Sequence, residues 1–238
     1  MAACLPRARS QLSYVEMNPI IVALDVDSAG EARRIVKAID RATTFYKVGM
    51  ELYAAAGMDF VRELKSEGNQ VFLDLKFYDI GETVKRAVAQ VDKAGVDMLT
   101  VHAQPQVMRA AVEGRGGAGL KLLGVTVLTS FDESDLAADG HPGTVEELVA
   151  RRVKNAREAN MDGVVCSPLE LVRIGGGGLL TVVPGVRSVG ASAGDQKRVA
   201  TPAEAIRDGA SYLVIGRQVT RAAEPRAEVE RILSEIAA

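Results

Sequence analysis

The sequence predicts a single (β/α)8 barrel, because eight short apolar segments alternate with longer amphipathic ones along 238 residues. Strands that alternate with helices form a parallel sheet, and eight repeats in this length favour closure into a barrel. An open doubly wound sheet is the alternative. No shift in composition marks a second domain. We therefore expect residues 18–238 to form the barrel and residues 1–17 to be a loosely ordered tail.

The expected strands are runs of β-branched or apolar residues, each followed by a segment with helical spacing. They lie at residues 20–24, 44–48, 70–75, 97–101, 121–128, 163–167, 179–183 and 212–216. Between them, apolar residues recur three and four apart, most clearly in 28–40 and 144–160, as amphipathic helices require. The glycine run at 175–178 predicts a helix end and a turn rather than a linker between domains.

Three helix starts carry capping residues. Ser28 precedes the first helix, and Thr144 is followed three residues later by Glu147, which is a capping-box pattern. Thr201 and Pro202 supply an N-cap with proline at the first helical position. The acidic loop at 130–143 gives no clear prediction.

Composition excludes several classes of function. Lys and Arg number 29 against 31 Asp and Glu, so nothing favours nucleic acid as a partner. Cys4 and Cys166 form no CxxC pair, which fits a reducing cytoplasm better than secretion. No apolar stretch approaches the length of a membrane span. His102 and His141 are the only histidines, so we expect no histidine-based metal site and no histidine relay.

In a (β/α)8 barrel, chemistry belongs at the carboxyl ends of the strands. The residues expected there are Asp25, Lys47, Asp74, Lys76, His102, Thr129, Ser167, Pro184, Arg187, Gly216 and Arg217. Asp74 and Lys76 stand two apart, so a regular strand would point both into the barrel mouth. Asp25 and Lys47 end the two preceding strands. The sequence therefore predicts an array of alternating Asp and Lys side chains in the mouth.

The array has two interpretations. Moving a charged side chain from water into such a mouth costs several kcal/mol of desolvation free energy unless the charge is paired. One possibility is therefore a buried structural ion-pair network. The other is a preorganised electrostatic site in which Lys76, held protonated by carboxylates, donates a proton to a carbanion as it forms. We favour the second interpretation, because buried ion pairs seldom stabilise a fold more than apolar packing does. His102, without a partner in the sequence, is more typical of a packing histidine.

A second group of residues predicts a phosphate site. The last two strands are followed by Pro184 to Arg187, then by the loop 188–198, and by Gly216 and Arg217. In many barrels the loops after strands seven and eight bind phosphate through backbone N–H groups. Either arginine alone would be an ordinary surface residue, and the prediction rests on both occurring at these ends.

Several segments match one known family. The most specific are the DxKxxDI pattern at 74–80, GDQKR at 194–198 and IGR at 215–217. From about residue 19 to the C-terminal helix, the chain resembles the bacterial orotidine 5'-phosphate decarboxylases. The resemblance implies a cytoplasmic enzyme of UMP biosynthesis that needs no cofactor and no metal.

The resemblance also implies roles for the charged residues. Asp25 and Lys47 would contact the ribose, Asp74 would face the departing carboxylate, and Lys76 would protonate C6 of the pyrimidine. The remaining implied contacts to the base, the phosphate and the loop that covers it are Thr129, Pro184, Arg187, Gln196, Gly216 and Arg217.

A homodimer is implied as well, in which Asp79, with Ile80 and Thr83, reaches the site of the neighbouring subunit. Three positions depart from the pattern common in the family: Gly81 and Glu82 stand where Pro-Asn is frequent, and Tyr78 stands where His is frequent.

Two other functions remain open. Sugar-phosphate decarboxylases and aldolases of the same wider group share the DxKxxD strand but use Mg²⁺. Lys47 stands where that group places a metal-binding glutamate, which argues against them. A catalytically silent phosphate-binding barrel is the second alternative, but such a protein has no reason to keep Lys76 within the charge array.

Overall fold

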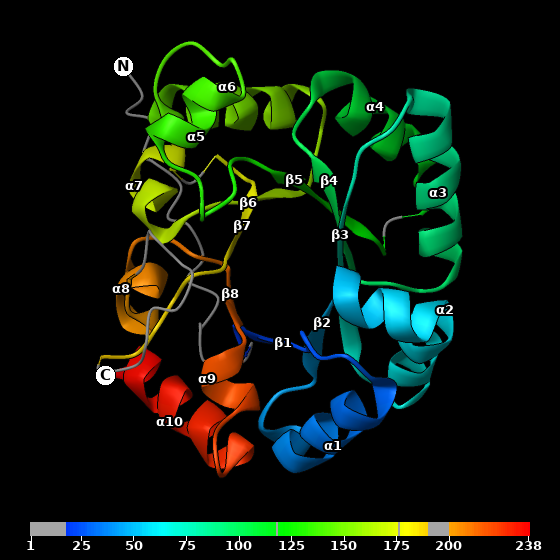
Figure 1. The fold of residues 1–238 in the computed structure, drawn as a ribbon, viewed down its shortest axis with the longest axis vertical. Coiled ribbons are helices and arrows are strands. Elements are labelled where there is room, and N and C mark those ends of the chain that lie inside the picture. Colours follow the sequence, from blue (N-terminus) through cyan, green and yellow to red (C-terminus); the bar gives the residue numbers. More distant parts are fainter. Residues whose placement is uncertain (1–17, 118, 176, 190–199) are drawn as a thin grey trace, which may run out of the picture.

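The computed structural model describes residues 18–117, 119–175, 177–189 and 200–238, and it shows a closed parallel barrel. The strands pair in chain order from β1 to β8, and β8 closes the ring on β1 (Figure 1). Their bounds are β1 Ile20–Ala23, β2 Phe45–Gly49, β3 Gln70–Phe77, β4 Met98–His102, β5 Lys121–Val125, β6 Gly163–Val165, β7 Leu180–Val183 and β8 Tyr212–Ile215. The predicted fold class is confirmed. The prediction of a loosely ordered tail at 1–17 lies outside the described residues.

Helices surround the ring of strands on its outside (Figure 1). The helices are α1 Ala29–Ile39, α2 Met50–Ser66, α3 Gly81–Lys93, α4 Pro105–Gly114, α5 Glu133–Ala138, α6 Val145–Glu158, α7 Leu171–Ile174, α8 Pro202–Arg207, α9 Arg217–Thr220 and α10 Pro225–Ala237, with short 3-10 turns at Asp40–Ala42 and Pro168–Glu170. In the described part of the chain, no helix has the length and apolar character needed to cross a membrane.

The predicted helix starts are confirmed. Ser28 accepts a hydrogen bond from the Glu31 amide, and Thr144 forms a capping box with Glu147. At α8, Thr201 is the N-cap and Pro202 the first helical residue. The glycine run also behaves as predicted at its start, since the backbone of Gly175 at φ 59° ends α7.

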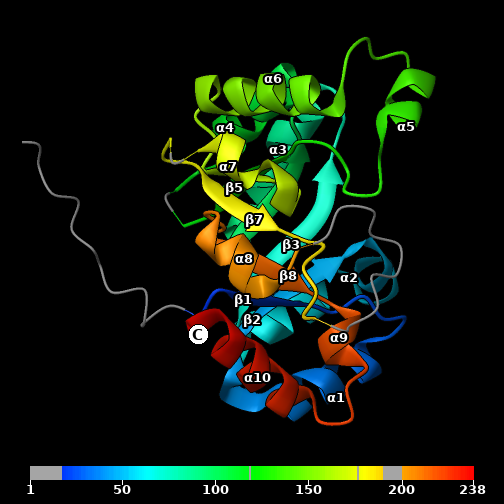
Figure 2. The ribbon, with the colours of Figure 1, turned by 90° about the vertical axis from the view of Figure 1, so that its left-hand side faces the viewer.

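Helix α5 was not predicted. It lies on a long loop that projects from the body of the barrel (Figure 2). A local signal was present, because Asp132 and Asp135 stand three apart and form a capping box. The strand bounds also differ from the prediction. β3 continues to Phe77, and β5 already ends at Val125, so Thr129 lies in the following loop.

Alternation along the strands separates two apolar clusters. The larger one packs the outer faces of the strands against the helices. The smaller one fills the inside of the barrel and contains Ile21, Ala23, Phe45, Phe72, Met98, Leu123, Val182, Tyr212 and Val214. Asp25, Lys47 and Asp74 each stand two residues after a member of this inner cluster. The same alternation that fills the barrel therefore directs these three charged side chains into its mouth.

Candidate active site

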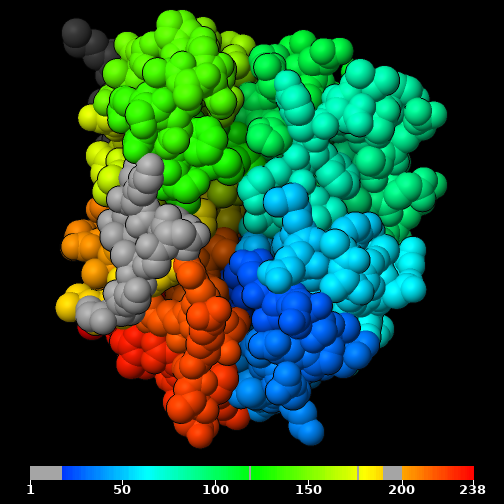
Figure 3. Space-filling view, in the orientation of Figure 1, coloured from blue at the N-terminus to red at the C-terminus, as the bar shows by residue number. Residues whose placement is uncertain are grey.

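The mouth of the barrel holds a cavity of about 520 Å³, a size typical of small-molecule sites. A hollow is visible near the middle of this face, where the blue, orange and green segments meet (Figure 3). The predicted residues that line the cavity are Asp25, Lys47, Asp74, Lys76, Thr129, Pro184, Arg187, Gly216 and Arg217. Two groups that the sequence places far apart, the charge array and the arginine-bearing loops, thus share one cavity.

The four charged side chains of the array are in contact. The Lys47 Nζ lies 2.7 Å from Asp25 Oδ1 and 3.7 Å from Asp74 Oδ2. The Lys76 Nζ lies 2.9 Å from Asp74 Oδ1. Charges of opposite sign therefore alternate from Asp25 to Lys76, as predicted. Asp74 is the central member, with an ammonium group on each side of its carboxylate.

Asp74 stays ionised although it is buried. Burial favours the neutral acid, but the positive charges of Lys47 and Lys76 and hydrogen bonds from Lys76 and Thr100 outweigh it. Together they hold the pKa of Asp74 below its usual value. A carboxylate in this state presents a fixed negative charge to whatever occupies the cavity.

The sequence argument for Lys76 was incomplete. Regular alternation in β3 was expected to direct Asp74 and Lys76 to one face, yet the backbone of Lys76 has a φ of 50°. Left-handed backbone costs a residue with a Cβ atom roughly 1–2 kcal/mol. The pairing of β3 with β4 also shifts between Leu73 and Phe77. The two side chains still converge, but through a local irregularity of the strand.

The segments that follow β7 and β8 carry the arginines of the cavity. Arg187 follows β7 and Arg217 begins α9, and both line the cavity. The backbone of Gly185 adopts a φ of 80°, a conformation suited to glycine, where the chain turns after β7. The Arg187 amide donates a hydrogen bond to Ala200 O, which brings the two described ends of this loop together. Gln196, which was predicted to contact the substrate, lies outside the described residues.

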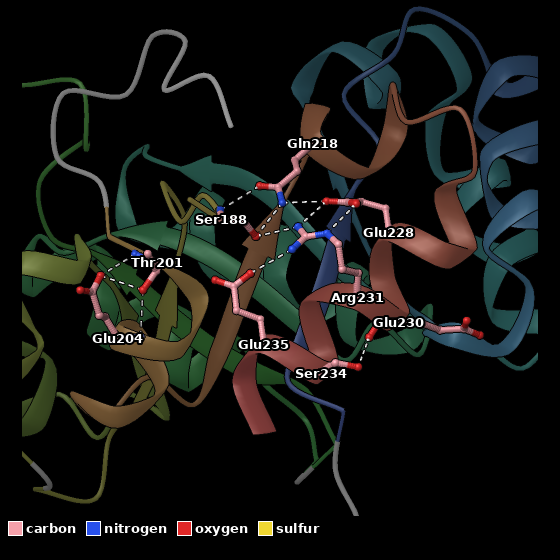
Figure 4. A network of polar contacts seen from close by, with 9 residues as sticks. All are labelled: Ser188, Thr201, Glu204, Gln218, Glu228, Glu230, Arg231, Ser234 and Glu235. Carbon is pink, nitrogen blue, oxygen red and sulfur yellow. Dashed lines mark hydrogen bonds and ion pairs between the residues drawn. The ribbon is translucent and has the colours of Figure 1, made fainter. Parts of the chain in front are cut away.

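A network of hydrogen bonds links the loop after β7, which carries Arg187, to helix α9, which begins with Arg217 (Figure 4). Ser188 Oγ accepts hydrogen bonds from Gln218 Nε2 at 2.9 Å and from Arg231 Nη2 at 2.8 Å. Arg231 in turn pairs with Glu228 and Glu235 on α10. The residues that precede Ser188 and Gln218 in the chain are the two arginines of the cavity. No local sequence pattern predicts this network, because its members come from three separate segments.

Among the described residues predicted at the site, His102 and Ser167 do not line the cavity, and neither do Asp79, Ile80 and Thr83. Asp79 and Ile80 are exposed in the loop between β3 and α3, with Ile80 71% accessible, and Thr83 lies in the first turn of α3. Asp79 Oδ1 accepts a hydrogen bond from the Ile80 amide. Tyr78 in the same loop is also exposed. This loop therefore presents apolar side chains and a carboxylate at the surface beside the site.

His102 behaves as a packing residue. Its ring meets the ring of Tyr78 edge-on, with centroids 5.2 Å apart. Burial and the positive charges of Arg152 and Lys76 lower the pKa of His102. The imidazole is therefore neutral at pH 7.

A second hollow of about 770 Å³ lies among α5, α6 and α7, outside the barrel. It is larger than the mouth cavity, but two of its charged groups, Glu146 and Arg173, pair with each other. Within the described ranges, no three His, Cys, Asp or Glu side chains are grouped as a metal site requires.

Comparisons with known proteins agree with one another. The family model described as "Orotidine 5'-phosphate decarboxylase / HUMPS family" matches residues 18–232. A Rhodopseudomonas palustris (strain BisA53) protein named orotidine 5'-phosphate decarboxylase is 49% identical over 220 residues, which cover 91% of this chain and 94% of that protein. A protein of the same name from Caulobacter sp. (strain K31) is 48% identical over 92% of this chain and 96% of its own length.

Solved structures show the same relation. The orotidine 5'-phosphate decarboxylase from Lactobacillus acidophilus superimposes with a TM-score of 0.82 at 36% identity, covering 93% of this chain and all (100%) of that one. The enzyme of the same name from Pyrococcus horikoshii OT3 gives a TM-score of 0.72 at 26% identity, covering 92% of this chain and 99% of that one.

Proposed function

Because the chain belongs to the orotidine 5'-phosphate decarboxylase / HUMPS family, we propose that it converts orotidine 5'-phosphate to UMP in pyrimidine biosynthesis. The observation that carries this proposal is the contact of Lys76 with Asp74 in a cavity that also contains two arginines. The substrate has a matching distribution of charge, with a carboxylate on the pyrimidine and a phosphate at the other end.

The reaction follows from the charges of the array. The substrate carboxylate would lie beside Asp74, so that its negative charge is repelled in the bound state and is relieved as CO2 leaves. The bond between C6 and the carboxyl carbon breaks, and its electron pair stays on C6. Lys76 Nζ then donates a proton to C6, giving UMP, and the neutral amine recovers a proton from solvent.

We propose that no cofactor takes part. The ammonium groups of Lys47 and Lys76 supply the positive charge that a carbanion needs. Both carboxylates of the array already pair with lysine, and a divalent cation would have to displace those lysines to bind there. This arrangement favours decarboxylation of the nucleotide over the Mg²⁺-dependent chemistry of sugar phosphates.

The rest of the cavity would bind the nonreacting part of the substrate. Asp25 and Lys47 would contact the ribose, and Thr129 would contact the base. The residues proposed to bind the phosphate and to form the loop that covers it are Pro184, Arg187, Gln196, Gly216 and Arg217. Arginine suits phosphate because its planar group donates two parallel hydrogen bonds. Binding energy from the phosphate would then position the pyrimidine against the charge array.

We also propose a homodimer in which Asp79, Ile80 and Thr83 complete the site of the partner. The exposure of Ile80 and the absence of all three residues from the lining of their own cavity support this arrangement. Met50, at the start of α2, is another large apolar residue that is exposed, at 62%.

The cytoplasmic location stays a prediction from the cysteine content.

The proposed function is tested by the loss of near-ultraviolet absorbance when the purified protein meets orotidine 5'-phosphate in the presence of EDTA. We expect complete conversion to UMP, because the proposed proton donor is a lysine and not a metal-bound group. If the folded protein does not turn over the nucleotide, the proposal is wrong. The alternatives are then the Mg²⁺-dependent sugar-phosphate decarboxylases and aldolases or a catalytically silent phosphate-binding barrel. Activity that EDTA removes would show that a metal is needed.

Gly49→Ala should disturb the array without disturbing the fold. An added Cβ would lie 2.7 Å from Asp25 Oδ1 and 2.9 Å from Lys47 Nζ, so both ends of this ion pair must move. Gly49 has a φ of −91°, which any residue can adopt. We expect kcat/KM to fall about 100-fold, as misplacement of reacting groups by about 1 Å does. The thermal midpoint should change little, since only flexible side-chain ends are displaced.

The matched control is Gly30→Ala in α1, where an added Cβ meets no atom within 4 Å. This variant should keep wild-type kinetics. Equal kinetics for the two variants would contradict the role given to the Asp25 and Lys47 pair.

A further inference from the structure

The pairing between β3 and β4 is interrupted at one place, next to the proposed site. Leu73 pairs with Leu99, and the next pair is Phe77 with Val101. Three residues of β3, from Asp74 to Lys76, therefore stand opposite the single residue Thr100 of β4. Such an irregularity bends a strand and re-aims its side chains, and it leaves backbone groups without their ladder partners.

The Thr100 side chain takes the place of the missing ladder partner. Its hydroxyl accepts a hydrogen bond from the Lys76 backbone N–H at 2.9 Å. The same hydroxyl donates a hydrogen bond to Asp74 Oδ1 at 2.9 Å. Thr100 has no exposed surface, so water does not compete for these two bonds. One buried side chain thus contacts both Asp74 and Lys76.

Lys76 needs such a restraint. Only Asp40, Lys76 and Asn160 among the described non-glycine residues have a positive φ. Asp and Asn adopt this conformation several times more often than other residues, and lysine has no such preference. The surrounding structure must therefore hold the Lys76 backbone in place.

We propose that Thr100 is a positioning residue, whose hydroxyl holds Lys76 in the left-handed backbone conformation that sets its ammonium group beside Asp74. The role of this position in catalysis rests on the proposed decarboxylation. Without the hydroxyl, the Lys76 amide and one Asp74 oxygen each lose a partner in a partly buried place, and the strand relaxes toward regular pairing. The proton donor then moves away from the carbon that it must protonate.

Thr100→Val tests this proposal, because valine keeps the shape of threonine and removes both hydrogen bonds. We expect kcat for orotidine 5'-phosphate to fall about 100-fold, the size of loss that a displacement of about 1 Å causes. KM should change little, because the proposed phosphate contacts follow β7 and β8, which do not pair with β3 or β4. Thr100→Ser keeps the hydroxyl and should restore most of the lost kcat.

Thr181→Val is the matched control. Thr181 on β7 is also buried, and its hydroxyl also donates to an oxygen, Gly209 O, and accepts from a backbone amide, that of Ser211; the Ser211 hydroxyl lies 3.3 Å from it as well. It lies near the start of its strand and does not line the cavity. We expect this variant to lose stability while it keeps wild-type kcat. The proposal is overturned if Thr100→Val keeps as much activity as Thr181→Val, or if Thr100→Ser is as slow as Thr100→Val.

Hydrogen exchange at the Lys76 amide gives a readout that does not depend on the reaction. In protein labelled with ¹⁵N-lysine, NMR should show slow exchange of this amide in the wild type and faster exchange in Thr100→Val but not in Thr181→Val. If the wild-type protein has no decarboxylase activity, the proposed function fails, but this pattern of exchange still supports the positioning of Lys76 by Thr100. Unchanged exchange in Thr100→Val overturns the positioning role whatever the activity.

Discussion

Lys76→Ala is expected to lower kcat for orotidine 5'-phosphate by about 10⁴-fold, the upper end of what one general acid contributes. The variant removes the proposed proton donor and one of the two ammonium groups that contact Asp74. The carbanion at C6 then forms next to a carboxylate with only the Lys47 ammonium group left in the array to stabilise it. The measurement is a single-turnover absorbance assay, with the dissociation constant of UMP determined in parallel to show that the cavity still binds a nucleotide.

The control for this variant is Lys65→Ala. Lys65 Nζ pairs with Asp97 Oδ2 at 2.6 Å, and the Lys65 side chain is 25% exposed, the same fraction as that of Lys76. Lys65 is at the end of α2, and Asp97 precedes β4, so the pair lies at the end of the barrel opposite the mouth. We expect its loss to lower the thermal midpoint and to leave kcat unchanged. Similar kcat values for both variants would argue that Lys76 acts only through stability.

The parts of the site that the sequence could predict are those that depend on local pattern. Asp25, Lys47 and Asp74 follow apolar strands at a spacing of two from inner-cluster residues, so alternation alone directs them into the mouth. The arginines lie beyond the last two strands, and they share the cavity because these strands also end at the mouth. Closure of the barrel then brings these ends together, whatever the details of the loops.

The parts that the sequence could not predict depend on pairing between distant segments. The left-handed backbone of Lys76 follows from the register of β3 against β4, and this register cannot be predicted from the sequence of one strand alone. From the sequence, Thr100 is predicted only as an ordinary β-branched strand residue. Its hydrogen bonds to Lys76 and Asp74 become apparent only in the structure, where β4 pairs with β3. Ser188 likewise gains its role only when α9 and α10 pack against the loop after β7.

Co-expression of an Asp79→Ala chain with a Lys76→Ala chain is expected to restore activity that neither variant has alone. If Asp79 acts across a two-fold interface, the mixed dimer holds one site that lacks both groups and one site that has both. A heterodimer purified through two different tags should therefore show about half the wild-type activity, since one of two sites is complete. Each homodimer, purified with the same two tags, serves as the control and should be nearly inactive.

The physical reason for this expectation is the position of Asp79 in the single chain. Its carboxylate is exposed in the loop after β3 and accepts a hydrogen bond from the next amide, and it does not line the cavity of its own chain. The apolar side chains of Tyr78 and Ile80 flank it at the surface, as expected at the edge of an interface. If Asp79 acted within its own chain, the mixed dimer would contain no complete site and would stay inactive. Absence of recovery in a confirmed heterodimer would therefore assign Asp79 to its own subunit and remove the shared-site arrangement.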